Sequence, residues 1–400
     1  KYFITDNILL SRYKVLILQA KTNQNNKQMK ITSLLRLLAI VILGFPTVTN
    51  AQTKWMNPMD SDEPYICGRA WNKEMGKSFN RLPDRFKATV SEKVWGNSTL
   101  TAGLTVRFAT TSRNISVKYV CASQNFGTLN LSGIVHSGVD LYGKAKDGKL
   151  HWIANHMNWR HVGDTMTISF PDLTVPTARG AEYTLYLPNY NGVKWLAVGV
   201  DSKSDFHFIR QSKERPIVVY GSSIIHGASP SRPGMSIPNI VSREMGYPLI
   251  NLGFSGSAYM EPGIFDMLGE IDARLFVLDP IPNSVNLTEK EIINRAVAGV
   301  KKLRSLSKAP ILLNECHPIP DSIFRANVAE RYTRANKAFR QAYLQLKATG
   351  INNLYYMHSN EINMSEDDMI EGTHPNDTGC RAYAEAYKRK IREILSKWKK

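Results

Sequence analysis

The sequence predicts an all-β sandwich followed by a three-layer α/β/α domain built on a five-stranded parallel sheet. Three observations lead to this prediction. The chain has 400 residues, which is enough for two or three domains. From about residue 55 to 205, short strand patterns are separated by Gly, Pro, Asn and Asp. After about residue 207, apolar strand patterns alternate with helical ones, as in a parallel sheet covered by helices on both faces.

Alternating apolar and polar residues mark the strands of the first half. Segments 104–108 and 115–120 show this period of two, which is typical of half-buried strands. Further strands are expected at 151–153, 165–170, 183–187 and 195–200. Many short strands joined by turn residues predict a sandwich.

Buried-type strands and amphipathic helices alternate in the second half. The expected strands are 217–220, 249–252, 275–278, 311–313 and 354–357. The expected helices are 237–245, 264–271, 288–307, 321–348 and one from about 378. Thr288 and Glu291 form a capping-box pattern, and Gly246 and Gly350 are typical helix ends. In such sheets, ligands bind beyond the carboxyl ends of the strands.

The formal net charge of +17 does not by itself indicate nucleic-acid binding. Seven basic residues and one acidic residue fall within residues 1–51, and another basic cluster lies in residues 388–400. The pattern favours a solvated basic helix face over a phosphate-binding patch. No stacking-aromatic motif accompanies the basic residues, so we expect no nucleic-acid partner.

The N-terminal region resembles a targeting segment. Met29 and Lys30 begin a basic start, residues 37–45 are apolar, and small and polar residues lead to Ala51. This order predicts a signal peptide at about 29–51, preceded by an upstream extension. The alternative is an uncleaved anchor, although the apolar run is short for a bilayer. We therefore expect export to the periplasm or the medium, with no stable membrane insertion after signal removal.

The four cysteines are widely spaced and include no CxxC motif. They are Cys67, Cys121, Cys316 and Cys380. This spacing argues against a zinc site, and we expect neither a metal nor a cofactor. Disulfides and buried thiols both remain open, because sequence alone does not pair cysteines.

Polar residues gather where the predicted parallel strands end. Ser222 and Ser223 follow the first strand, and Gly256 follows the second. Asn283 follows the third strand. Glu371 and His374, three residues apart, follow the last. A hydroxyl, an imidazole, a carboxylate and amide donors at one sheet edge are the groups that acyl transfer needs.

These blocks resemble the SGNH or GDSL-type hydrolases over roughly residues 214–400. "GSS" at 221–223, "GFSG" at 253–256, "DPIPN" at 279–283 and "EGTH" at 371–374 stand in the order of that family's blocks. Upstream, "GVDLY" at 138–142 resembles the signature of a β-rich domain, GxDLY, found before such hydrolases in exported bacterial proteins. The resemblance implies a flavodoxin-like hydrolase domain at 207–400 and a jelly-roll-like sandwich at 52–206.

The resemblance also implies roles for the strand-end residues. Ser223 would be the nucleophile, His374 the base and Glu371 the third triad member. The backbone amides of Ser223 and Gly256 and the side chain of Asn283 would form the oxyanion hole.

Several positions leave alternatives open. Ser222 stands where the family usually has Asp and is a competing nucleophile. Glu371 also replaces Asp, so Asp367, Asp368 or a backbone carbonyl are rival partners for the imidazole. His226 is expected either to line the substrate pocket or to lie solvated in a turn. Asp377 is expected to cap the last helix.

The implied activity is a serine esterase that removes short acyl groups, often acetyl, from a carbohydrate ester. Aromatic residues of the first half, including Trp152 and Trp195, either present rings to a sugar or form the sandwich core. Asp140 and Tyr142 are expected to be structural. Two alternatives are a non-catalytic carbohydrate-binding protein and an acyltransferase. The sequence leaves the oligomeric state open.

Overall fold

The computed structural model describes residues 52–154, 159–320 and 322–398. The expected signal peptide at 29–51 and the extension before it lie outside the described residues. Residues Gln52–Lys400 form one compact unit. Within the described ranges, none of the helices is long and apolar enough to span a bilayer.

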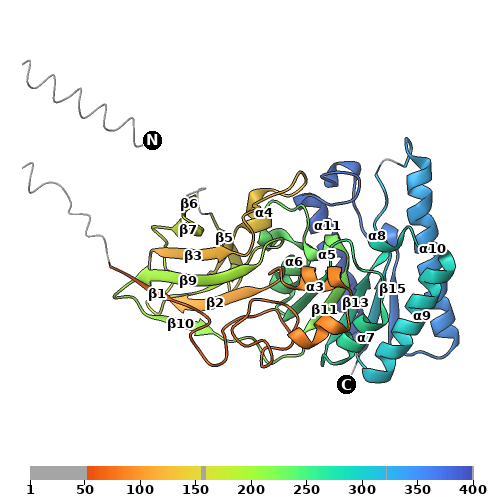
Figure 1. Cartoon of the computed structure of the whole chain (residues 1–400), viewed down its shortest axis with the longest axis horizontal. Coiled ribbons are helices and arrows are strands. Elements are labelled where there is room, and N and C mark those ends of the chain that lie inside the picture. Colours follow the sequence, from red (N-terminus) through yellow and green to blue (C-terminus); the bar gives the residue numbers. More distant parts are fainter. Residues whose placement is uncertain (1–51, 155–158, 321, 399–400) are drawn as a thin grey trace, which may run out of the picture. The chain divides into compact units, whose positions relative to one another are not determined.

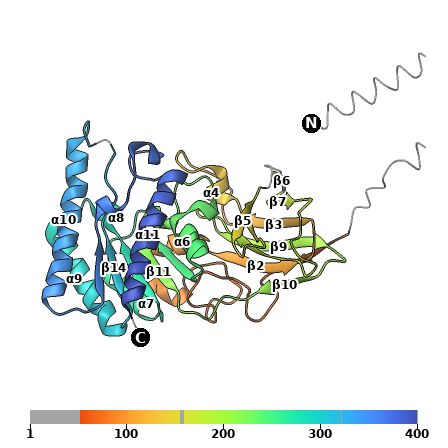
Figure 2. The same ribbon diagram turned by 180° about the vertical axis from the view of Figure 1, so that it is seen from behind.

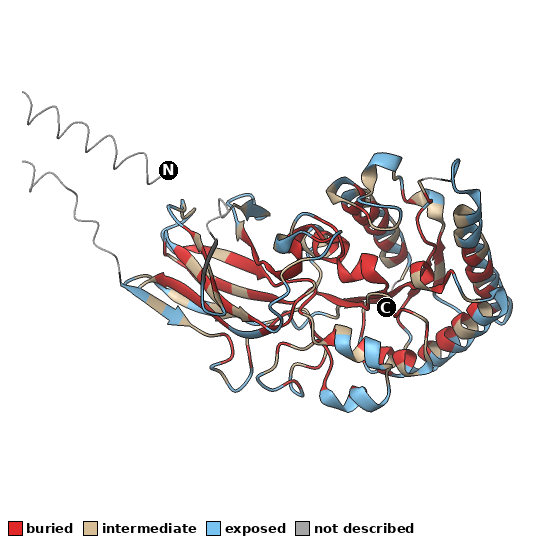
Figure 3. Cartoon of the chain, turned by 45° about the horizontal axis from the view of Figure 1, so that its top comes forward, coloured by how far each residue is buried: buried red, intermediate tan, exposed pale blue. Residues whose placement is uncertain are grey.

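Two antiparallel five-stranded sheets form the predicted sandwich (Figure 1). The first has the order β1 (Thr53–Met56), β9 (Val193–Asp201), β3 (Ile115–Cys121), β7 (Thr165–Phe170) and β6 (Trp159–Val162). The second has the order β10 (Phe206–Ile209), β2 (Thr105–Thr110), β8 (Ala181–Tyr186), β4 (Asp140–Lys144) and β5 (Leu150–Ile153). Along β3, buried residues alternate with partly exposed ones, and the buried set enters the sandwich core (Figure 3). The short helix α4 (Gly133–Ser137) leads into β4.

The second half contains the predicted parallel sheet, which confirms the α/β fold. Its order is β12 (Leu249–Gly253), β11 (Ile217–Gly221), β13 (Leu275–Asp279), β14 (Ile311–Asn314) and β15 (Leu354–Met357). The first strand in sequence therefore lies between the second and the third. The order in which strands are added to the sheet thus reverses at β11, although all five strands are parallel. Ligand sites of open parallel sheets form at such a point, beyond the carboxyl ends of the strands.

Helices cover both faces of this sheet. One face packs against α7 (Pro262–Gly269), α9 (Glu289–Leu306) and α10 (Ala326–Ala348). The other packs against α6 (Ile237–Met245) and α11 (Asp377–Lys397), which lie side by side (Figure 2). All three predicted cap features are confirmed. Thr288 and Glu291 form a capping box, Gly246 ends α6 in the left-handed region, and Gly350, at φ +79°, directly follows the C-cap of α10.

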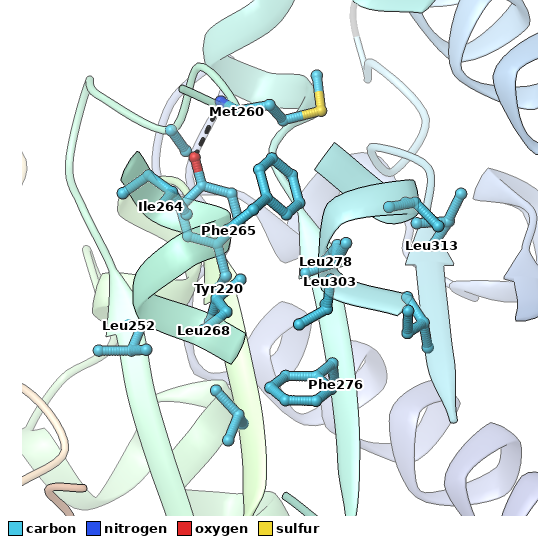
Figure 4. Packing of buried hydrophobic residues seen from close by; sticks show 14 of the residues in the cluster. Tyr220, Leu252, Met260, Ile264, Phe265, Leu268, Phe276, Leu278, Leu303 and Leu313 are labelled. Carbon is cyan, nitrogen blue, oxygen red and sulfur yellow. Dashed lines mark hydrogen bonds between the residues drawn. The ribbon is translucent and has the colours of Figure 1, made fainter. Parts of the chain in front are cut away.

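Alternate residues of β11 pack on opposite faces of the parallel sheet. Ile217 and Val219 contact the α6 and α11 side, whereas Val218 and Tyr220 contact the α7 and α9 side. The Tyr220 ring packs beside Ile264 and Phe265, and its hydroxyl accepts a hydrogen bond from the Met260 amide at 3.0 Å (Figure 4). The strand is therefore held on both faces just before its functional end.

Short helical turns make up the remaining elements. They are α5 (Ser223–His226), α8 (Ile281–Ser284), η2 (Pro233–Met235), η3 (Ser359–Glu361) and η4 (Glu366–Asp368). The N-terminal region adds η1 (Asp84–Ala88) and α3 (Glu92–Ser98). Two of these turns, α5 and α8, directly follow the carboxyl ends of β11 and β13.

Part of the expected sandwich region packs elsewhere. Trp71, Leu82, Phe86 and Val94 lie in the same core cluster as α7 and α9 of the C-terminal half. At the other end, β10 extends the sandwich to Ile209. The strand patterns that predict the sandwich all lie beyond residue 100. Residues 69–98 contain no strand, so those patterns do not indicate where this segment packs.

All four cysteines are buried and free, so the thiol alternative holds. Burial raises the pKa of the Cys67 thiol to about 11 and that of Cys121 to about 12. Burial also raises the pKa of Cys316 and Cys380 above the ordinary thiol range.

Candidate active site

The nucleophile candidate lies on the sharp turn that follows β11. Gly221 ends the strand where an added Cβ would come within 2.8 Å of the Asp279 carbonyl oxygen. Ser222 is fully buried, and its Oγ accepts a hydrogen bond from the Ile224 amide at 3.4 Å. Ser223, the first residue of α5, lines a cavity. The turn thus uses Ser222 as a helix cap and exposes Ser223 to the cavity.

Ser223 and His374 meet, although 151 positions separate them. The Oγ of Ser223 lies 2.7 Å from Nε2 of His374, which is hydrogen-bonding distance. His374 stands on the loop between β15 and α11, where its carbonyl accepts from the Ile370 amide at 2.8 Å. This loop contact places the imidazole over the end of β11.

Glu371 lies beside the imidazole, where the third member of the expected triad would be. Its Oε1 contacts Nδ1 of His374 and also accepts the His374 backbone amide at 3.0 Å. Its Oε2 accepts the Thr373 amide at 3.1 Å. The loop therefore curls around the longer glutamate side chain and brings the carboxylate to the imidazole.

The rival carboxylates do not reach the imidazole. Asp368 accepts the Ser365 amide at 2.6 Å, and Asp367 contributes its carbonyl oxygen to Asn376. The expectation that Asp377 caps α11 is wrong. Asn376 caps the helix, accepting the Thr378 amide at 3.0 Å, whereas Asp377 binds Ser231. Asn376 is the cap because it stands immediately before the first helical turn, whereas Asp377 is already the first residue of the helix.

The expected oxyanion residues border the same cavity. Gly256 has a φ of +61°, a left-handed conformation that favours glycine. Asn283 lies on α8, and its Oδ1 accepts the Ala258 amide at 3.0 Å. With Oδ1 held in this way, the donor end of the amide is the part left for a ligand.

The cavity measures about 610 Å³ and brings together the residues expected from the sequence. Its lining contains Ser223, Gly256, Asn283, Glu371, Thr373, His374 and Tyr332. The arrangement can transfer a proton from a hydroxyl to an imidazole beside donors for a negative oxygen. Among the residues that the structure describes, no cluster of three His, Cys, Asp or Glu is placed to hold a metal ion.

His226 fits neither of its two expected positions. It is fully buried and absent from the cavity lining, and its Nε2 lies 2.8 Å from the Asn189 carbonyl oxygen. Burial lowers the pKa of His226 well below its usual value, with a further contribution from the Arg81 charge. It is therefore a neutral packing residue behind the nucleophile turn.

Residues of the N-terminal half hold this turn in place. The Tyr190 ring lies 4.4 Å from the His226 ring, and its hydroxyl donates to the Ser223 carbonyl at 3.4 Å. The Asn189 side chain donates to the Gly227 carbonyl at 3.0 Å. Sequence reasoning missed both supports, since they precede the motif by more than thirty residues.

A buried arginine supports the oxyanion side. Arg81 donates to the carbonyls of Asn251 and Gly253 at 3.0 and 2.9 Å, at the end of β12. Burial lowers the pKa of Arg81 to about 9. Its position was not predictable, because nothing near residue 81 marks it as a partner of β12.

The comparisons with known proteins place this chain among the hydrolases. Residues 214–392 match the GDSL-like lipase/acylhydrolase family, and residues 53–206 match GxDLY, the N-terminus of SGNH-hydrolase-type esterases. A GDSL-like lipase from Bacteroides ovatus ATCC 8483 has 32% identity and a TM-score of 0.76, with 86% of this chain and 98% of that chain covered. The chain belongs to the GDSL-like lipase/acylhydrolase family and is an esterase. The resemblance seen in the sequence is confirmed.

Two more distant structures share the fold. The salicylyl-acyltransferase SsfX3 from a tetracycline biosynthetic pathway has 16% identity and a TM-score of 0.66, covering 86% of this chain and 97% of that one. A family two carbohydrate esterase from Cellvibrio japonicus has 12% identity and a TM-score of 0.53, covering 86% and 98%. None of the curated proteins compared matches the chain.

Proposed function

We propose that the chain is an exported serine esterase that removes a short acyl group, such as acetyl, from a carbohydrate ester. The observation that carries the proposal is the 2.7 Å contact between Ser223 Oγ and His374 Nε2 at the end of β11. A serine hydroxyl is a weak nucleophile until a base takes its proton. The carboxylate of Glu371 at Nδ1 supplies the orienting third group.

In the proposed reaction, Ser223 Oγ attacks the ester carbonyl carbon while His374 Nε2 takes the hydroxyl proton. The carbonyl oxygen becomes an oxyanion, which the amides of Ser223 and Gly256 and the Nδ2 of Asn283 stabilise. The C–O bond to the alcohol then breaks, and His374 returns the proton to the leaving oxygen. Water repeats the sequence on the acyl-enzyme and releases the acid and free Ser223.

The proposed substrate rests on two supports. The cavity has a mixed polar lining and a volume of about 610 Å³, which suits a small acyl group attached to a polar alcohol. One protein of the same fold is named as a carbohydrate esterase. Export agrees with a polymeric substrate outside the cell and rests on the sequence pattern of residues 29–51.

A panel of p-nitrophenyl esters and acetylated sugars tests the proposal. We expect turnover of acetyl esters by the mature chain and loss of at least about 10³-fold in Ser223→Ala. Ser222→Ala is the matched control: it removes a neighbouring hydroxyl that faces a backbone amide, and we expect it to retain most activity. Full activity in Ser223→Ala would refute the nucleophile assignment.

The acyl acceptor needs its own measurement. The same acyl-enzyme yields a new ester if a sugar hydroxyl replaces water. Products are therefore analysed with and without a free sugar acceptor, and a predominance of transferred acyl groups would replace hydrolysis with acyl transfer.

A further inference from the structure

A second and larger cavity lies outside the active site. It measures about 1020 Å³ and runs between the β2, β8, β4 and β5 side of the sandwich and the α6 region of the hydrolase half. None of its lining residues borders the active-site cavity. We call this cavity the interdomain groove. Any ligand there would contact the protein independently of Ser223.

The "GVDLY" motif builds one wall of the interdomain groove. Asp140 is buried, and its carboxylate accepts from the Trp152 indole at 2.6 Å and from the Gly234 amide at 3.1 Å. Arg232 lies 3.3 Å from the same carboxylate. The Tyr142 ring lies under the Arg243 guanidinium at 4.4 Å. The motif thus orders one tryptophan and two arginines at this surface.

Trp152 is fixed in place yet remains open to solvent. Its indole N–H is held by Asp140, and the Arg232 guanidinium stacks on its ring at 4.2 Å. Even so, 49% of the residue is exposed. An immobilised aromatic ring with free surface binds a flat apolar face at little cost in conformational entropy. The C–H face of a sugar ring is such a surface.

The lining of the interdomain groove is strongly basic. Two acidic residues, Glu182 and Glu244, accompany seven basic ones: Arg107, Lys144, Lys149, Arg232, Arg243, Arg381 and Lys388. Arg107 and Lys144 share the single carboxylate of Glu182, at 3.6 and 3.4 Å. The hydrogen bonds of Arg243 go to carbonyl and tyrosine oxygens. The backbone amide of Lys149 donates to the Asp147 carboxylate at 2.9 Å. Arg381 and Lys388 share the carboxylate of Glu244, and Arg232 pairs with Asp140. The cations still outnumber the carboxylates beside them, and this excess favours an anionic ligand.

We propose that the interdomain groove binds an acidic oligosaccharide, with the ring of Trp152 stacked on one sugar and the surrounding cations paired with uronate carboxylates. Both halves of the recognition are needed. The basic residues alone would accept any polyanion, and the tryptophan alone would accept a neutral glycan. Binding in this groove would hold an acidic glycan on the enzyme without occupying the catalytic cavity.

Isothermal titration of the mature chain with hexagalacturonate tests the proposal, with maltohexaose as the neutral ligand. We expect binding of hexagalacturonate at least about tenfold tighter than maltohexaose, weakening as salt rises from 50 to 500 mM. Trp152→Ala should weaken binding at least about tenfold. Trp195→Ala is the matched control, because Trp195 is also a half-exposed sandwich tryptophan, at 40%, but does not line the groove. The affinity of this variant for hexagalacturonate should stay within about twofold of the wild-type value.

A charge variant keeps the test valid if Trp152→Ala fails to fold. Lys144→Gln with Lys149→Gln removes two exposed groove cations and should weaken hexagalacturonate binding at least about fivefold. Lys301→Gln with Lys337→Gln removes the same charge from α9 and α10 and should change it little. Equal binding of both hexasaccharides would overturn the proposal, as would polyphosphate or phosphatidylglycerol vesicles binding equally well and without dependence on Trp152. No turnover enters these measurements, so their outcome is separate from that of the esterase proposal.

Discussion

The Nδ2 of Asn130 lies 3.5 Å from Nδ1 of His374, although the two residues are 244 positions apart. Asn130 belongs to a loop of the N-terminal half, between β3 and α4. Its carbonyl accepts the Ser229 hydroxyl at 3.0 Å, and its Oδ1 accepts the Thr128 hydroxyl at 3.2 Å. The N-terminal half therefore reaches the imidazole itself as well as the nucleophile turn.

Asn130→Asp should change the pH dependence of catalysis. A second carboxylate beside Nδ1 favours the charged imidazolium, which cannot act as the base. We expect the acidic limb of the kcat/KM profile to move to higher pH, with the plateau activity falling less than about tenfold. A pH profile on p-nitrophenyl acetate measures this shift.

Asn125→Asp is the matched control for this experiment. It introduces the same charge into the same loop, where the native Asn125 side chain accepts the Gly127 amide at 3.3 Å. The control should keep the wild-type profile. An identical shift in both variants would mean that the effect reflects loop charge in general and not the contact with His374.

Glu371→Gln should lower kcat by about 10–10²-fold, less than His374→Ala does. The glutamine keeps the shape and one acceptor for Nδ1 but loses the charge that stabilises the imidazolium. The side chain is 41% exposed, so water partly compensates for that loss. Steady-state kinetics on an acetyl ester provide the measurement.

Asp368→Asn serves as the control for Glu371. It removes a nearby carboxylate that binds the Ser365 turn instead of the imidazole. Activity should remain near wild type. If Asp368→Asn lost as much activity as Glu371→Gln, the third triad position would need reassignment.

Asn283→Asp should distinguish the role of the side-chain oxygen as an acceptor from the role of the side-chain nitrogen as a donor. The aspartate keeps an oxygen for the Ala258 amide but replaces the donor with a negative charge beside the developing oxyanion. We expect kcat to fall by about 10²–10³-fold or more. The thermal midpoint should stay close to that of the wild type.

Asn283→Ala provides the comparison, because it also removes the acceptor of the Ala258 amide. This variant should lose both activity and some thermal stability. Wild-type kcat in Asn283→Asp would exclude the side chain from the oxyanion hole.

Asp279 should make the stability of the protein depend on pH. Burial raises its pKa to about 6, and hydrogen bonds from Tyr383, Tyr387 and Asn314 limit the rise. Between about pH 4 and 6, the native state keeps a proton that the unfolded chain has lost. The free energy of unfolding therefore falls as pH rises through this window, by up to about 3 kcal/mol from this group.

Asp279→Asn removes this titration, so its free energy of unfolding should fall less steeply between pH 4 and 6 than that of the wild type. Urea unfolding at several pH values measures the slope. Asp266→Asn, an exposed change on α7, should keep the wild-type slope. The same slope in wild type and Asp279→Asn would contradict the buried, proton-binding carboxyl.

Local sequence patterns predict most of the fold. The apolar runs of β11 to β15 predict a buried parallel sheet because both of its faces are covered. Strand β4 was missed, since Asp140 and Gly143 interrupt its apolar pattern. Asp140 is nevertheless buried because Trp152, Gly234 and Arg232 satisfy its carboxylate. Those partners lie on other elements and leave no trace in the local sequence.

The site was predictable to the extent that its residues follow strands. Ser223, Gly256, Asn283 and His374 border one cavity because parallel strands end at one edge. The reach of Glu371 was not predictable, since it depends on how the loop bends around the extra methylene. Arg81, Asn130 and Tyr190 come from the N-terminal half, and only the tertiary packing brings them to this edge.

The buried thiols described above have a practical consequence. A thiol reagent modifies the thiolate, and all four cysteines are kept protonated and out of its reach at neutral pH. Cys67 and Cys121 lie in the first half of the chain, and Cys316 and Cys380 in the second. Labelling therefore reports local unfolding, and mass spectrometry of the labelled peptides would show which half of the molecule unfolds locally first.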